Sequence, residues 1–154
     1  MKNLKLKERN FSLKKKRLLE ALKILNKDIS KIEEIIDRIV HNILIEGKIL
    51  LCGNGGSAAD AQHLAAEFLV RLRPKVNRKP IAAISLAMDT STITACGNDY
   101  SFEKLFSRNL EALSNINDIL IVISTSGNSK NILSTLQTAK KLKIFSIGLL
   151  GNNG

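Results

Sequence analysis

The sequence predicts a doubly wound α/β domain with a parallel sheet, preceded by a long helical segment. Three observations predict this class: helical spacing of apolar residues in the first part of the chain, four short apolar runs rich in Ile or Val, and helix-like stretches between those runs. The 154 residues, 44% of them hydrophobic, are enough for one ordinary core. We therefore expect a helical segment over residues 1–46 and one α/β domain over residues 47–154.

The first segment has apolar residues three and four positions apart between residues 13 and 44, which is the spacing of one face of an amphipathic helix. These residues are Leu18, Leu22, Leu25, Ile29, Ile32, Ile36, Ile39 and Ile43. The spacing predicts long helical material, and the pattern allows a break near Ser30.

After Gly47 the apolar runs become too short for buried helices, which favours buried parallel strands. The expected strands are residues 48–52, 81–87, 119–124 and 144–150. Helix-like stretches over residues 57–72, 102–113 and 129–142 separate or flank them. The last run, 144–150, predicts an apolar strand at a sheet edge, where it invites pairing with another chain.

The net charge of +10 is compatible with an anionic partner. The positive residues are densest over residues 2–23, and aromatic side chains do not alternate with them as base stacking would need. A basic surface also attracts phosphorylated metabolites. We therefore expect no nucleic-acid partner.

The cysteines and the apolar runs indicate the compartment. Cys52 and Cys96, with His41 and His63, match neither a disulfide framework nor a zinc module, so both cysteines are expected to be packed thiols. No apolar run approaches a membrane span of about 20 residues, and the lysine-rich first residues lack the apolar core of a signal peptide. The expected location is the cytoplasm, without membrane association.

Residues 52–57, Cys-Gly-Asn-Gly-Gly-Ser, lie between an expected strand and an expected helix. Glycines there let the backbone approach a ligand, and the helix N-terminus offers unpaired amides to an anion. Gly53, Gly55 and Ala58 also fit a dinucleotide-binding turn. A dinucleotide-binding turn is followed by an acidic residue about 20 positions later. Here the first acid after the second expected strand is Asp89, which is farther along the chain. A plain glycine turn remains the other alternative.

His63 and Glu67 are four positions apart on the helix that follows, so they share one face. An imidazole and a carboxylate at this spacing can meet one metal ion or one substrate. A surface ion pair is the alternative. The position of the pair near the glycine turn favours a site.

A second loop between an expected strand and an expected helix carries four hydroxyl groups, those of Ser124, Thr125, Ser126 and Ser129. Hydroxyls and amides beside a helix N-terminus can hold a phosphate without a lysine. Alternatively, Asn128 or Ser129 caps the next helix. Capping explains one residue of this kind and not four.

Asn98 and Asp99 supply an amide and a carboxylate that can hydrogen-bond sugar hydroxyls, or they form a turn before the next helix. They belong to residues 89–99, which are expected to form a loop. This loop, the glycine turn and residues 125–129 all follow strand ends, where open α/β sheets place ligand sites.

Three motifs in this order resemble the phosphoheptose isomerases of the sugar-isomerase (SIS) domain family. They are GNGGSAADAQHLAAE at 53–67, DTSTITACGNDYSFEKLFSRNLEAL at 89–113 and ISTSGNSKNIL at 123–133. The resemblance implies a three-layer, flavodoxin-like domain and a homotetramer with sites at subunit contacts. It also implies interconversion of sedoheptulose 7-phosphate and D-glycero-D-manno-heptose 7-phosphate, which supplies heptose for lipopolysaccharide.

The resemblance also implies roles for individual residues. The sugar would be contacted by Asn54, Gly55, Gly56 and Ser57, its hydroxyls by Asn98 and Asp99, and the phosphate by Ser124, Thr125, Ser126 and Ser129. His63 and Glu67 are implied as zinc ligands, and Glu67 as the group that moves a proton between C1 and C2. Such an exchange passes through an enediolate, which needs a carboxylate for the proton and an electrophile such as zinc.

The sequence also departs from the family pattern, which continues with a further strand and a helix carrying a glutamine and a histidine. Those residues complete the zinc site and provide a second acid/base, and a half-site binds zinc more weakly. Three interpretations stay open: a fragment, a site completed by another polypeptide, or sugar-phosphate binding without full catalysis.

Two alternative functions, from other classes of protein, also stay open. One is a regulatory relative that binds the replication initiator, and the other is a nucleotide-cofactor oxidoreductase. Retention of the glycine turn, His63, Glu67 and the hydroxyl loop argues for the isomerase.

Overall fold

The computed structural model of the chain describes residues 2–87 and 89–152, and it leaves the side chains of residues 2–10, 17, 24 and 25 undescribed. The described residues form two units, one reaching to Arg38 and the other beginning at Ile39. The limits of the expected segments at residues 1 and 154 lie outside this description.

The first unit consists of α1 (Lys2–Lys27) and the first part of α2 (Ile29–Leu44). The helical prediction is confirmed, and the break falls at Asp28, just before the expected Ser30. On the predicted apolar face, Leu18 and Leu22 are 61% and 48% exposed, while Leu25 is outside the described side chains. None of the described helices has the length and apolarity that crossing a membrane requires.

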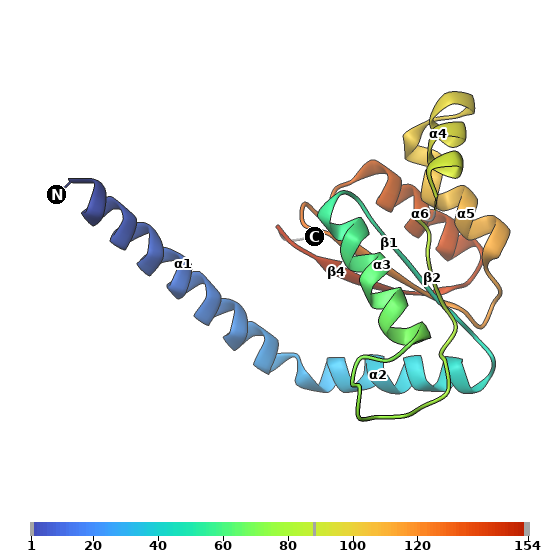
Figure 1. The fold of residues 1–154 in the computed structure, drawn as a ribbon, viewed down its shortest axis with the longest axis horizontal. Helices are drawn as coiled ribbons and strands as arrows, with labels where there is room; N and C mark the ends of the chain where they lie inside the picture. Colours follow the sequence, from blue (N-terminus) through green and yellow to red (C-terminus); the bar gives the residue numbers. More distant parts are fainter. Residues whose placement is uncertain (1, 88, 153–154) are drawn as a thin grey trace. The chain divides into compact units, whose positions relative to one another are not determined.

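The second unit contains a four-stranded parallel sheet. Its strands are β1 (Ile49–Gly53), β2 (Ala83–Ser85), β3 (Ile119–Ser124) and β4 (Phe145–Leu150). They lie in the order β2-β1-β3-β4 (Figure 1), which matches the first four strands of the flavodoxin-like order. The predicted parallel α/β architecture is confirmed, and β2 is shorter than the expected 81–87.

Burial follows the position of each strand in the sheet. Every residue of the central strand β1 is buried, and β3 is buried except at Ile123. In β4, at the sheet edge, Leu149 and Leu150 are 52% and 43% exposed. The sequence therefore identified the apolar edge strand correctly.

Helices cover the sheet on both faces (Figure 1). Helix α3 (Gly56–Leu69) lies on one face, and α5 (Leu105–Leu113) and α6 (Lys130–Lys141) lie on the other. Helix α4 (Thr90–Asp99) and the 3₁₀ turn η1 (Phe102–Lys104) pack against α5. The expectation of a loop over residues 89–99 was wrong, because Asp89 caps a helix that begins at Thr90.

The core lies between the sheet and the α5/α6 layer. Its largest members include Leu50, Phe106, Leu110 and Leu120, which are at most 1% exposed. Cys52 belongs to the same cluster, and burial raises the pKa of its thiol to about 12. Cys52 and Cys96 are both free and buried, which confirms the prediction of packed thiols.

A buried acid joins the starts of β1 and β3. Asp118, whose side chain is 1% exposed, accepts hydrogen bonds from the Lys48 amide at 2.9 Å and the Asn115 amide at 2.7 Å. The Lys48 ammonium lies 2.5 Å from the same carboxylate. This cluster aligns the two central strands at the end of the sheet opposite the loops described next.

Candidate functional site

The connections that follow the two central strands, β1 and β3, run to opposite sides of the sheet, and this creates a crevice between them. β1 leads to β2 on one side of the sheet, and β3 leads to β4 on the other side. Open α/β sheets bind ligands at such a switch point, outside the carboxyl ends of the strands. The glycine turn follows β1 and the hydroxyl loop follows β3, so both predicted loops lie at this crevice.

Two glycines of the turn, Gly53 and Gly55, are required by the backbone conformation, and the third, Gly56, is not. A Cβ at Gly53 would lie 2.5 Å from the Ser57 carbonyl oxygen, and Gly55 has φ 55°. A Cβ at Gly56 would meet no atom within 4 Å. A plain turn therefore accounts for Gly53 and Gly55, whereas the missing side chain at Gly56 keeps open space in front of α3.

The hydroxyl loop brings three serine side chains together. The Oγ atoms of Ser124, Ser126 and Ser129 lie 3.4 Å from one another in all three pairs. Ser129 occupies the N-cap position of α6, yet its side chain makes no capping hydrogen bond. The capping alternative therefore does not account for this hydroxyl, which faces the other two serines.

The two loops enclose a small polar pocket of about 40 Å³. It is lined by Asn54, Ser57, Ile123, Ser124, Thr125 and Ser129. Two of the expected sugar-binding residues and three of the expected phosphate-binding residues are thus brought together. Gly55, Gly56 and Ser126 belong to the same loops without lining this pocket.

His63 and Glu67 are adjacent on α3, as their spacing predicted. His63 Nε2 lies 3.5 Å from Glu67 Oε1, and the side chains are 73% and 25% exposed. Two ligand atoms on a tetrahedral zinc ion, each about 2.0–2.2 Å from the metal, lie roughly 3.4 Å apart, so the pair fits two positions of such a site. Across residues 2–87 and 89–152, no group of three His, Cys, Asp or Glu side chains is placed to hold a metal ion.

Asn98 and Asp99 lie at the end of α4 and are both exposed. Asn98 Nδ2 donates to Asp99 Oδ1 at 2.8 Å, and neither residue lines the pocket between the glycine turn and the hydroxyl loop. The Arg108 guanidinium on α5 lies 3.9 Å from the centre of the Tyr100 ring, which follows α4. This contact ties the end of α4 to α5.

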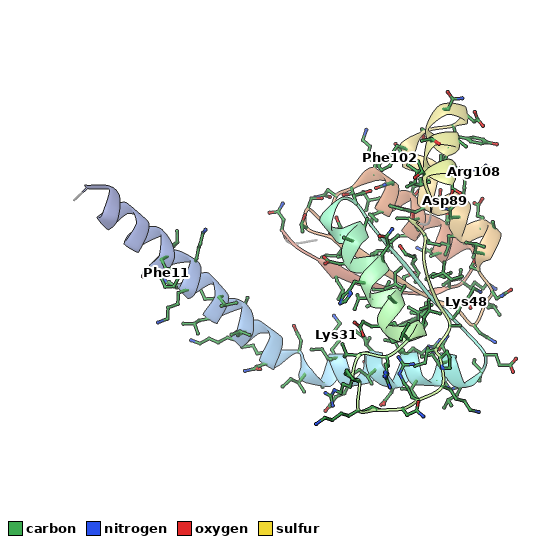
Figure 2. All side chains as sticks on the ribbon, viewed as in Figure 1. Phe11, Lys31, Lys48, Asp89, Phe102 and Arg108 are labelled. Atoms are coloured by element: carbon green, nitrogen blue, oxygen red, sulfur yellow. The ribbon has the colours of Figure 1, made fainter. Side chains whose placement is uncertain are left out.

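Asp89 fixes the other end of α4 (Figure 2). Its carboxylate accepts hydrogen bonds from the Thr92 amide at 2.8 Å and the Thr92 hydroxyl at 2.7 Å. These bonds hold the pKa of Asp89 below its ordinary value. With this carboxylate engaged as a cap, the structure gives no support to a ribose-binding role in a dinucleotide site.

The lowered pKa makes the stability of α4 depend on pH. The folded state prefers ionised Asp89, so its contribution is complete above the ordinary Asp pKa of about 3.9 and disappears as the pH falls through the lowered value. We expect the helical Cα chemical shifts of residues 90–99 to decline in that acid range. Asp89→Asn, which keeps a capping oxygen, should weaken this pH dependence, and Asp89→Ala should lower the helicity at neutral pH. Unchanged shifts in Asp89→Ala would contradict the capping role.

Sequence reasoning missed two residues that support the site. Arg78 lies in the connection between α3 and β2, and its guanidinium donates to the carbonyls of Glu67 at 2.5 Å and Phe68 at 2.8 Å. Asn131, on α6, forms a pair of hydrogen bonds with Asn54. Asn131 lies within the motif at 123–133, but its pairing with Asn54 leaves no local signal, because the two residues are 77 positions apart. Arg78 and its partner Glu67 are 11 positions apart.

The fold and the crevice define a class, and comparison with known proteins agrees with it. The family model of the SIS domain matches residues 11–151. The chain is thus an SIS-domain protein, with its polar pocket at the β1/β3 switch point.

Within this class, relatives with similar sequences share one name. A phosphoheptose isomerase of Helicobacter pylori strain P12 is 49% identical over 144 residues, covering 90% of this chain and 73% of the relative. The chain belongs to the phosphoheptose isomerase family.

Solved structures give the same result. A phosphoheptose isomerase from Neisseria gonorrhoeae matches with a TM-score of 0.70 and 43% identity, over 77% of this chain and 60% of that one. The enzyme from Francisella tularensis matches with a TM-score of 0.68 and 36% identity, over 84% and 76%. The chain therefore spans between three fifths and about three quarters of these relatives.

Proposed function

We propose that the chain is a phosphoheptose isomerase that interconverts sedoheptulose 7-phosphate and D-glycero-D-manno-heptose 7-phosphate. The observation that carries the proposal is the triangle of serine hydroxyls at the β1/β3 crevice, opposite the glycine turn. Three converging hydroxyls beside the first turn of α6 suit an oxyanion with several acceptor oxygens.

The helix α3 joins this phosphate pocket to the proposed acid/base group. Ser57 lines the pocket, and Glu67 follows on the same helix at about 15 Å along its axis. Side chains on a helix lean toward its N-terminus, which shortens this separation. The reacting carbons C1 and C2 lie at the opposite end of a heptose 7-phosphate from its phosphate, so an elongated arrangement of this kind supports a long sugar phosphate.

Glu67 is the proposed proton-transfer group. In the ketose-to-aldose direction its carboxylate removes a proton from C1, which leaves an enediolate. A proton then passes from the C1 hydroxyl to the C2 oxygen, and Glu67 returns the proton it took from C1 to C2, which gives the aldehyde at C1. Arg78 anchors the backbone at this point, because its guanidinium binds the Glu67 carbonyl oxygen. The Glu67 side chain is 25% exposed and so stays accessible to a substrate.

Zinc is the proposed cofactor, and His63 and Glu67 are its proposed ligands from the described residues. Their 3.5 Å separation fits two positions of a tetrahedral ion. When bound, zinc would stabilise negative charge on the sugar oxygens of the enediolate. Asn98 and Asp99 are proposed to bind sugar hydroxyls.

The same proposal extends to the assembly of the chain, its location and the use of its product. The family's homotetramer, with sites at subunit contacts, is the proposed assembly, and the cytoplasm is the proposed location. The heptose phosphate would feed lipopolysaccharide precursors.

Turnover tests the proposed function. The purified chain is incubated with sedoheptulose 7-phosphate and zinc, and the aldose anomeric proton is followed by NMR. Growth of this signal is the expected result. Absence of the signal from folded protein would overturn the isomerase assignment, and retained binding of the sugar phosphate would then indicate a binding protein.

The phosphate pocket is tested by substitution. Ser126→Ala and Ser129→Ala should each weaken affinity for sedoheptulose 7-phosphate roughly tenfold or more, because each removes a hydrogen bond to a charged group. Calorimetry measures the affinity, and Ser114→Ala, at the end of α5, is the matched control. Unchanged affinity in both variants would return the loop to a structural role.

A further inference from the structure

Two carboxamides join the walls of the pocket. Asn54 follows β1, and Asn131 lies in the first turn of α6. Asn54 Nδ2 donates to Asn131 Oδ1 at 2.9 Å, and Asn131 Nδ2 donates to Asn54 Oδ1 at 2.8 Å. The two bonds run in opposite directions between the same pair of groups, so each amide sets the rotation of the other.

The orientation of this pair is determined by the backbone of α6. The Ile132 amide donates to Asn131 Oδ1 at 3.0 Å, and only the oxygen of a carboxamide can accept such a bond. Asn131 Oδ1 therefore faces the helix amide and Asn54 Nδ2, and Asn131 Nδ2 faces Asn54 Oδ1. Asn131 is itself 3% exposed, so water does not compete for these positions.

The surroundings of Asn131 hold it from a second side. The hydroxyl of Thr135, which is fully buried, donates to the Asn131 carbonyl oxygen at 2.6 Å. Asn131 also lies two positions after Ser129, so the same turn presents a pocket hydroxyl and the amide that binds Asn54. The pair thus connects the glycine turn to the hydroxyl loop.

Asn54 keeps one hydrogen for a ligand. The Nδ2 group has two hydrogens, of which Asn131 takes one. Asn54 lines the pocket, whereas Asn131 does not. Without its partner, the Asn54 side chain would be free to rotate and would present either its oxygen or its nitrogen to the pocket.

We propose that Asn131 is a positioning residue, which holds the Asn54 carboxamide so that its second N–H donates to an oxygen of the bound sugar phosphate. This inference rests on the proposed function, because it takes a sugar phosphate as the ligand. Asn131 acts only through Asn54. The serine hydroxyls supply the phosphate contacts independently of this pair.

A double-mutant cycle separates this role from a merely structural one. Asn131→Ala should weaken affinity for sedoheptulose 7-phosphate about tenfold in the wild-type background, the loss of one oriented hydrogen bond. In the Asn54→Ala background the same substitution should change affinity little. Affinity for inorganic phosphate should stay near that of the wild type in Asn131→Ala. Calorimetry with the two ligands measures all four proteins.

The matched control is Thr135→Val, which removes the buried hydroxyl and keeps the amide pair. It should leave sugar phosphate affinity close to that of the wild type. The side-chain ¹⁵N signal of Asn54 gives a second readout, since it should shift in Asn131→Ala and stay in Thr135→Val. If Asn131→Ala does not unfold cooperatively, Asn131→Leu replaces it, because it fills a similar volume and makes neither hydrogen bond to Asn54.

The outcomes distinguish the two proposals. Wild-type protein that does not bind sedoheptulose 7-phosphate overturns the proposed function, and this assignment with it. Wild-type binding with an equal loss from Asn131→Ala in both backgrounds overturns only the positioning role. A loss of affinity confined to the wild-type background, accompanied by the shifted Asn54 signal, supports the positioning role.

Discussion

Turnover of sedoheptulose 7-phosphate is expected to fall about 10²–10⁴-fold when Glu67 is replaced by glutamine, the range for loss of a general base. Glutamine has nearly the same size and keeps an oxygen, but it cannot accept the proton from C1 at neutral pH. Substrate affinity should change far less than kcat. Initial rates by NMR and binding by calorimetry measure the two quantities.

The same variant has a stricter readout in D₂O. Wild-type protein should exchange the C1 proton of the ketose for deuterium, and Glu67→Gln should abolish the exchange. Glu103→Gln, an exposed carboxylate on η1, is the control and should retain wild-type rates. A fully active Glu67→Gln protein would remove Glu67 from the proton-transfer role.

Asp118→Ala is expected to lower the free energy of unfolding by about 3 kcal/mol, because it leaves the Lys48 ammonium and two backbone amides without their shared acceptor. Asp118→Asn should lose less, since its one oxygen still serves one amide. Urea unfolding followed by circular dichroism measures both variants.

The matched controls locate the effect. Lys48→Met removes the ammonium while keeping the backbone amide, so it should cost less than Asp118→Ala. Glu111→Ala, an exposed acid on α5, should change stability by no more than about 0.5 kcal/mol. A similarly small effect of Asp118→Ala would show that this cluster does not hold the two strands.

The sequence predicted the sheet well because its strands are nearly continuous apolar runs. Residues 119–124 coincide with β3, and the expected 144–150 differs from β4 by one residue at its start. Helix α4 was missed because Thr and Ile weaken its helical propensity and Gly97 weakens it further. Asp89 was the available signal, as a capping residue directly before the helix.

The parts of the candidate site that consist of neighbouring residues in one segment were predictable from the sequence. Residues 53–57, the hydroxyl loop and the His63/Glu67 pair are each local patterns, and the sheet order explains why the two loops meet. Asn131 belongs to the motif at 123–133, where the sequence assigned it no role. Its role depends on Asn54, 77 positions away, and spacing along the chain carries no information about such a pair.

The alignment of β1 with β3 also bears on how the chain folds. The Lys48–Asp118 bonds join residues 70 positions apart, so the centre of the sheet forms only after a long segment has closed. Domains dominated by such distant pairings fold slowly. During synthesis β1 leaves the ribosome well before β3, and its apolar residues Ile49, Leu50 and Leu51 stay exposed until β3 follows. We expect the newly made chain to be most open to aggregation in that interval, when β1 can pair with β2 but its other edge has no partner strand.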